Sequence, residues 1–260
     1  MQANTQFFFQ AKDLLWQWTS RNIRARYQQS ALGWFWAVIQ PAAQALIFTV
    51  VFTYIVPIDT GDVPYVLFAY VAIVAWTLLA MSLPDMSNSL IENMSLVTKI
   101  YFPREVLPIA ALLARLLDFG VAAILIAILM IIFRVPLYPP GLLFLPIILA
   151  ILLILILGLG LALSALNVFY RDVRSLLVLG LQLWFYASPI IYPISLVPEW
   201  LRPYYFLNPM AGIITAFRDV LLYQQLPGSY LAIAGFISLA MFIIGYWFFK
   251  RVEFQFADIV

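Results

Sequence analysis

Long uncharged stretches divide the chain into predicted membrane-spanning helices. The first stretch covers residues 27–58, which are 32 consecutive positions without a charged side chain. The hydrocarbon core of a bilayer requires about 20 apolar residues per helix. The pattern therefore predicts an all-α polytopic membrane protein with six transmembrane helices, at roughly 33–56, 66–84, 107–133, 141–166, 176–194 and 229–249.

Basic residues concentrate on alternate connecting segments. Segments 1–32, 85–106, 167–175 and 250–260 carry ten of the 14 Lys and Arg residues, namely Lys12, Arg21, Arg24, Arg26, Lys99, Arg104, Arg171, Arg174, Lys250 and Arg251. The opposite segments carry Arg134, Arg202 and Arg218. Because basic loops remain in the cytoplasm, the N and C termini are both predicted to be cytoplasmic.

The segment before the first span predicts an interfacial amphipathic helix within residues 1–32. One face would hold Phe7, Ala11, Leu14, Trp18 and Ala25, and another would hold Gln17, Arg21, Arg24 and Gln28. Such a helix would lie in the membrane interface with its rings toward lipid. A simple membrane anchor is the alternative role.

The coupling segment, residues 85–106, predicts a short amphipathic helix on the cytoplasmic side. Pro84 would end the second span, and Ser89 with Glu92 has the spacing of a capping box. Apolar residues follow at helical spacing, at Leu90, Ile91, Met94 and Val97. The segment suits docking to a partner, and a plain connecting helix is the alternative.

Residues 193–224 predict an external re-entrant helical hairpin. Pro193 and Pro198 would break the fifth span, residues 199–202 would form one short helix, and Asn208 before Pro209 is typical of an N-cap. Ile213, Ile214, Phe217 and Leu221 then form an apolar stripe. So apolar a hairpin is tolerated at membrane depth when it packs on protein. No repeat or linker interrupts the chain, which predicts one domain over residues 1–260.

Composition narrows the function. The chain is 65% hydrophobic and 10% charged, with net charge +2 and no Cys or His. These values exclude a soluble domain and disfavour a nucleic-acid partner. They also remove disulfides and the commonest metal ligands. No G-x-x-x-x-G-K-[ST] motif occurs, so the chain itself is not expected to bind ATP at a P-loop.

Arg115 and Asp118 are charged residues inside the third predicted span. They lie three residues apart on one helical face, where mutual pairing lowers the cost of membrane burial. An intramembrane ion pair is therefore predicted. A gating or substrate role and proton coupling remain alternatives.

Five collinear stretches carry a family resemblance: RYQQSALGWFWAVIQP (26–41), LVTKIYFPREVLP (96–108), NVFYRDVRSLL (167–177), YASPIIYPISLVPEWLR (186–202) and LNPMAGIITAFRDVLL (207–222). Together they resemble the membrane subunit of ABC-type exporters of lipid-linked polysaccharides, the O-antigen and teichoic-acid permease family. The resemblance implies a homodimeric channel in the cytoplasmic (inner) membrane. It also implies two copies of a separate cytoplasmic ATPase that bind ATP and Mg²⁺, and a cargo carried on undecaprenyl-type pyrophosphate.

Aromatic residues are candidates for the channel wall, because sugar rings pack on aromatic faces without fixed hydrogen-bond registry. The candidates are Trp34, Phe35, Trp36, Trp184, Phe185, Tyr186 and Tyr192. A membrane-interface belt or core packing is the alternative for each ring.

Charged residues are candidates for lipid recruitment and coupling. Arg21, Arg24 and Arg26 suit the pyrophosphate, with topology, anionic-lipid attraction or ATPase contact as alternatives. The resemblance implies ATPase contacts in the coupling segment, at Glu92, Lys99, Arg104 and Glu105. It also implies an external gate in the hairpin, with Pro193, Trp200, Arg202, Asn208, Pro209 and Arg218 as its residues. Within the gate, a structural ion pair among Arg202, Arg218 and Asp219 competes with release of the lipid head group.

Other functions fit the sequence less well. A related exporter of capsular polysaccharide, teichoic acid, a drug or a lipid is the first alternative. A membrane enzyme acting on polyprenyl-phosphate sugars would need acidic clusters for metal chemistry, and the acidic residues here are dispersed. A structural assembly protein explains the spans but not the apolar external hairpin.

Overall fold

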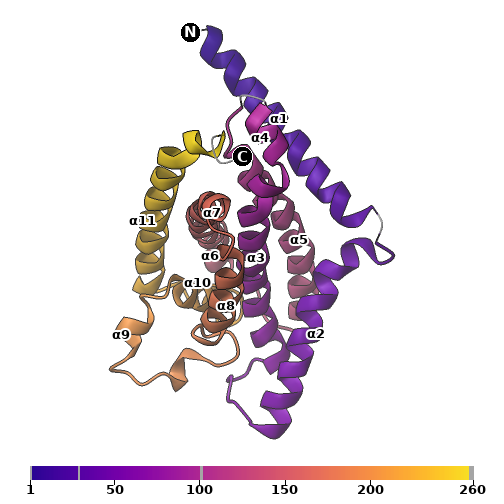
Figure 1. The fold of residues 1–260 in the computed structure, drawn as a ribbon. Coiled ribbons are helices and arrows are strands. Elements are labelled where there is room, and N and C mark those ends of the chain that lie inside the picture. Colours follow the sequence, from indigo (N-terminus) through magenta and orange to yellow (C-terminus); the bar gives the residue numbers. More distant parts are fainter. Residues whose placement is uncertain (1, 29, 100–101, 258–260) are drawn as a thin grey trace.

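A computed structural model describes residues 2–28, 30–99 and 102–257, with side chains between residues 12 and 256. Every regular element in these ranges is a helix (Figure 1). The α-helices are α1 (Gln2–Tyr27), α2 (Trp36–Val50), α3 (Tyr65–Glu92), α4 (Met94–Lys99), α5 (Val106–Ile132), α6 (Pro139–Leu142), α7 (Leu145–Phe169), α8 (Val173–Tyr186), α9 (Arg202–Tyr205), α10 (Pro209–Leu221) and α11 (Ser229–Val252). Short 3₁₀ or π turns are η1 (Gly33–Phe35), η2 (Val51–Ile55), η3 (Ile194–Leu196) and η4 (Glu253–Ala257). The Phe7 and Ala11 positions predicted for the apolar face of α1 lie outside the described side chains.

Five of the six predicted spans are present as helices long and apolar enough to cross a membrane. They are Gly33–Ile55, Tyr65–Glu92, Val106–Ile132, Pro139–Phe169 and Ser229–Phe256. The predicted fifth span, 176–194, is wrong as a single helix because α8 has only 14 residues. At 1.5 Å per residue α8 is about 21 Å long, whereas the hydrocarbon core is about 30 Å thick. Pro189 explains the early end, since it has no N–H and disfavours helical geometry at Ser188.

The order of close contacts fixes the directions of the helices. Asp85 of α3 meets Arg115 of α5, and Tyr70 meets Ala122, so α3 and α5 are antiparallel. Gly245 of α11 lies against Gly158 of α7, and Gly235 lies near Ile151, so α7 and α11 are parallel. The chain between α7 and α11 must therefore return through the bundle. It does so through α8 and the irregular segment after it.

Helix α3 is the central helix of the bundle and continues through Pro84, where the sequence predicted an end. Beyond Pro84 the helix packs on α7. Met86 is buried against Gly160, and Asn167 donates to the Ser87 carbonyl at 3.0 Å. This packing outweighs the hydrogen bond that proline removes.

The coupling segment is consequently not one helix. Ser89 donates to the Met86 carbonyl at 2.7 Å inside α3 and does not cap a new helix. The segment consists of the last turns of α3, the short helix α4 and the turn that leads to α5, with residues 100–101 outside the described ranges.

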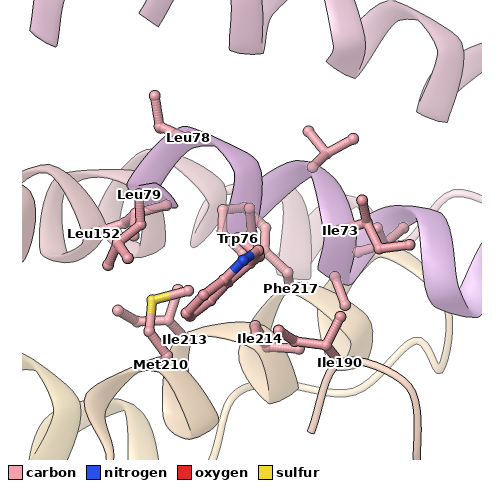
Figure 2. Packing of buried hydrophobic residues seen from close by; sticks show 14 of the residues in the cluster. Ile73, Trp76, Leu78, Leu79, Leu152, Ile190, Met210, Ile213, Ile214 and Phe217 are labelled. Atoms are coloured by element: carbon pink, nitrogen blue, oxygen red, sulfur yellow. The ribbon is translucent and has the colours of Figure 1, made fainter. Parts of the chain in front are cut away.

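Helix α10 is buried along almost its whole length. The Asn208 N-cap is confirmed, since its Oδ1 accepts from the Met210 amide at 3.1 Å and Pro209 follows it. The short helix predicted at 199–202 lies slightly later, as α9. Figure 2 shows Trp76 of α3 lying next to Met210 and Ile213 of α10, which joins the hairpin to the central helix.

Candidate translocation face and coupling surface

The first group of channel candidates lies on the surface where α2 begins. Trp34, Phe35 and Trp36 are all exposed, and the Trp34 ring stacks on Tyr27 with centroids 5.0 Å apart. The stack joins the end of α1 to the start of the first span. These rings are therefore available to lipid, cargo or another subunit.

The second group, in and after α8, divides between core and surface. Phe185 is buried and packs on Phe48 and Trp76, with ring centroids 6.0 and 5.7 Å away. Its side chain therefore belongs to the core of the described chain, which disfavours its predicted place in a channel wall. Tyr186, the next residue, is 59% exposed. Tyr192 is half-buried, and its hydroxyl lies 2.8 Å from that of Tyr205.

Asn208 holds α8 to the hairpin. Its Oδ1 accepts from Trp184 Nε1 at 2.8 Å, while its Nδ2 donates to the Ala187 carbonyl at 3.1 Å and to Ser188 Oγ at 2.9 Å. The sequence identified the cap but not these long-range contacts, because nothing local pairs residue 208 with residue 184. Trp184 thus has its polar atom directed at the hairpin.

Arg115 and Asp118 lie in a larger charge cluster made of Arg26, Tyr27, Asp85, Arg115 and Asp118. Arg26 lies 2.8 Å from Asp85 and 2.6 Å from Asp118, and Arg115 lies 2.7 Å from Asp85 and 3.3 Å from Asp118. Tyr27 donates to Asp118 as well. The predicted pair is thus present, but each member has a closer partner from another helix. The cluster connects α1, α3 and α5.

The charge cluster also changes the view of the three arginines on α1. Arg26 is bound to two carboxylates, which disfavours it as a phosphate ligand. Arg21 donates to Asn93 Oδ1 at 3.0 Å and stacks over Trp18 at 4.4 Å, and Arg24 is exposed. Burial, followed by the hydrogen bond to Asp118, raises the pKa of Tyr27 to about 12, so its hydroxyl stays a donor.

A polar cavity of about 330 Å³ lies beside the charge cluster, between α1, α3 and α5. Its lining includes Trp18, Asn22, Asn88 and Glu92. A cavity this large and polar can hold water. It indicates that the junction between α1 and the bundle is hydrated.

The predicted coupling residues occupy different environments. Glu92 and Lys99 are exposed at the ends of α3 and α4. Glu105 Oε1 pairs with Lys250 Nζ at 2.8 Å, and Lys250 also pairs with Glu253 at 3.2 Å. The Arg104 guanidinium lies 5.7 Å from the Phe256 ring centroid. Glu105 and Arg104 thus connect the start of α5 to the end of α11.

The external candidates include no Arg218–Asp219 pair. Arg218 is 4% exposed and donates to the carbonyls of Phe68, Pro189 and Ile190 at 3.2, 2.5 and 2.7 Å. Asp219 instead accepts from Tyr230 of α11. The expected ion pair within the gate is therefore wrong for Arg218, whose guanidinium is held by main-chain carbonyls.

The remaining gate candidates lie closer to the surface. Arg202 forms a long ion pair with the exposed Glu199, at 3.8 Å, and donates to the Val197 carbonyl at 3.0 Å. Trp200 is exposed and Pro193 is half-buried. They are surface residues of the hairpin, unlike Arg218.

Five helices of the described structure are long and apolar enough to cross a membrane, which is the pattern of a multi-pass membrane protein. Residues 13–222 match the model of the ABC-2 type transporter membrane family, and the chain belongs to that family. It is 27% identical over 263 aligned residues to the O-antigen export system permease protein RfbA of Klebsiella pneumoniae, covering 100% of this chain and 98% of that protein.

The alignments with two further relatives cover a smaller share of the chain. The O-antigen export system permease protein RfbA of Myxococcus xanthus is 28% identical over 224 residues, 85% of each chain. The polysialic acid transport protein KpsM of Escherichia coli is 24% identical over 206 residues, 78% of each chain.

Proposed function

We propose that this chain is the channel-forming permease of an ATP-driven exporter, and that two copies enclose the path of an undecaprenyl-pyrophosphate-linked, O-antigen-like polysaccharide. The names of the full-length relatives support the cargo class. We extend the cargo class named in those proteins to this chain. ATP and Mg²⁺ would be bound by two copies of a separate ATPase.

The observation that carries the proposal is the short helix α8. Its backbone leaves helical geometry after Tyr186, about 21 Å from its start. Irregular backbone at membrane depth is stable only when it is buried in protein or faces water. Ser188, Pro189 and Ile190 are buried, but Tyr186 and Ala187 are exposed. A water-filled path along the outer surface of α8 satisfies this requirement.

Exposed residues of α8 and α2 are of types that suit a sliding sugar chain. Tyr186 and Gln182 are exposed on α8, and Gln40 and Trp36 are exposed on α2. Aromatic rings and amides contact sugars without selecting one repeat unit. A second copy that presents the same face would close the path, as a two-fold symmetric interface requires.

The opposite end of the molecule suits coupling to an ATPase. The chain has no P-loop motif, so the energy must come from another subunit or a gradient. Helix α4 carries the exposed Lys99 and begins two residues after the exposed Glu92. We assign α4 and the end of α3 to the ATPase contact, and Arg21 and Arg24 to recruitment of the lipid pyrophosphate.

The first test is the ATPase activity of this chain co-expressed with the ATPase encoded beside it, with and without polyprenyl-pyrophosphate glycan. A stable two-protein complex whose ATPase activity responds to that glycan is expected. If no ATPase copurifies, the assignment of α4 falls and the exporter function with it.

The second test uses the absence of native cysteine. Single cysteines at Tyr186 and Gln182 should react with a membrane-impermeant maleimide. A cysteine at Ile243, which is exposed in the middle of α11 and is expected to face lipid, should not react. Bound glycan should slow the first two reactions. If none of the three cysteines reacted with the maleimide, α8 would lie against lipid, and a hydrated path would be contradicted.

A capsular polysaccharide is the second candidate cargo. The match to the polysialic acid transport protein supports it, although it covers less of the chain. The two candidates separate in the same ATPase assay when capsular and O-antigen glycans are supplied in turn.

A further inference from the structure

A cavity of about 590 Å³ that is lined by apolar residues lies between α5 and α7. Both helices pack closely on α3 but touch each other much less, which leaves a slot between them. Val74 of α3 forms part of its floor, Ile126 and Met130 of α5 form one wall, and Leu149 of α7 forms the other. Phe217 and Leu221 of α10 close one side of the slot.

The slot opens sideways, away from the centre of the bundle. Ile131 and Leu137, which line its mouth, are 77% and 67% exposed. Both follow Asp118 on the chain and so lie beyond the charge cluster, on the side of α5 that leads away from α1. The medium at this mouth is the membrane, since both walls belong to predicted spans.

The chemistry and size of the slot select its occupant. Protein interiors are close-packed, so an apolar volume this large does not stay empty in contact with lipid. Water requires two to four polar partners, and all the lining residues are apolar. The walls belong to helices that can span a membrane, where hydrocarbon chains are the surrounding apolar medium, so the slot suits a hydrocarbon chain.

We propose that the slot between α5 and α7 binds an acyl chain of a membrane phospholipid. Phe217 and Leu221 would rest on this chain, so the lipid would support α10 at the residues that flank Arg218. The proposal depends on the membrane location of the protein and not on the identity of the cargo.

The test is photo-crosslinking of the wild-type protein in liposomes containing a phospholipid with a diazirine in its acyl chain. Mass spectrometry should place crosslinks on Ile126, Met130 and Phe217. Phe217 decides the result, because it is only 6% exposed and lies behind the slot. Crosslinks confined to exposed residues such as Ile124 would overturn the proposal.

A variant and a matched control sharpen the test. Ala123→Phe adds a ring inside the slot, whereas Ile124→Phe adds one on the exposed surface of the same helix. Crosslinks to Met130 and Phe217 should be lost in the first variant and kept in the second. Equal labelling in both would also overturn the proposal.

A diazirine-labelled polyprenyl phosphate distinguishes the lipid source. Capture of this probe at Phe217 in preference to the phospholipid would contradict an acyl-chain site. Delipidation should lower the melting temperature of the wild type, and added phospholipid should restore it. The melting temperature of Ala123→Phe should change less on delipidation than that of the wild type. Equal changes in the two proteins would count against the site.

Discussion

The two ends of the molecule neutralise their charges by different means. In the charge cluster two guanidinium groups meet two carboxylates, and the side chains are 14–30% exposed. Arg218 is a single buried guanidinium that meets three carbonyls and the face of the Phe68 ring, 3.4 Å away. Two of those carbonyls, from Pro189 and Ile190, belong to the irregular segment that follows α8.

The difference shows how a broken helix and a buried charge stabilise each other. Carbonyls outside a helix need donors at membrane depth, and a buried arginine needs acceptors. At Arg218 the guanidinium supplies the donors and the carbonyls supply the acceptors, so no carboxylate is needed. The charge cluster instead joins three separate helices by opposite charges, so water and salt should affect it more.

Replacing Arg218 should have the largest effect on stability. Arg218→Met leaves three carbonyls without their donor and should cost about 3–5 kcal/mol. Thermal unfolding in detergent measures it, and Arg218→Lys should recover part of the loss because it keeps the charge and some donors. A melting temperature equal to wild type would show that the carbonyls find other donors.

Breaking the charge cluster should have an intermediate effect. Asp118→Asn leaves Arg26 and Arg115 sharing Asp85 and should cost about 1–3 kcal/mol. The double variant Arg26→Met with Asp118→Asn restores the balance of charge, so it should lose less than the sum of the single changes. Strict additivity in the same unfolding assay would mean that these groups do not interact.

The Lys250–Glu105 pair should matter less, because Lys250 is about a third exposed. Lys250→Met should cost about 0.5–1 kcal/mol at low salt. Raising the salt concentration should narrow its difference from wild type, while leaving the Arg218→Met difference unchanged. If salt changed the stability loss of the two variants equally, the ion pairs at one end would not differ from the Arg218 site in their exposure to water and salt.

Breaking the Arg202–Glu199 pair should have the smallest effect. Its nearest carboxylate, Glu199, is 3.8 Å away and exposed. Glu199→Gln should change stability by less than about 0.5 kcal/mol. A large loss would mean that this pair, rather than Arg218, holds the hairpin.

Sequence periodicity and charge were sufficient to predict the features that depend on neighbouring residues in the chain. Apolar length alone identified five helices, since a membrane span needs only enough consecutive apolar residues. The Asn208 cap also follows from neighbouring residues, because a cap and its helix are adjacent in the chain. Arg115 and Asp118 were paired correctly for the same reason, as they are three residues apart.

Only the tertiary structure decided which partners came from far along the chain. Pro84 was expected to end α3, but packing of Met86 on Gly160 carries the helix onward. Arg26 joins Asp85 and Asp118 across 59 and 92 residues, and Arg218 joins Phe68 across 150 residues. Such contacts gain their free energy from burial and mutual satisfaction in the folded bundle, and sequence spacing does not encode that burial.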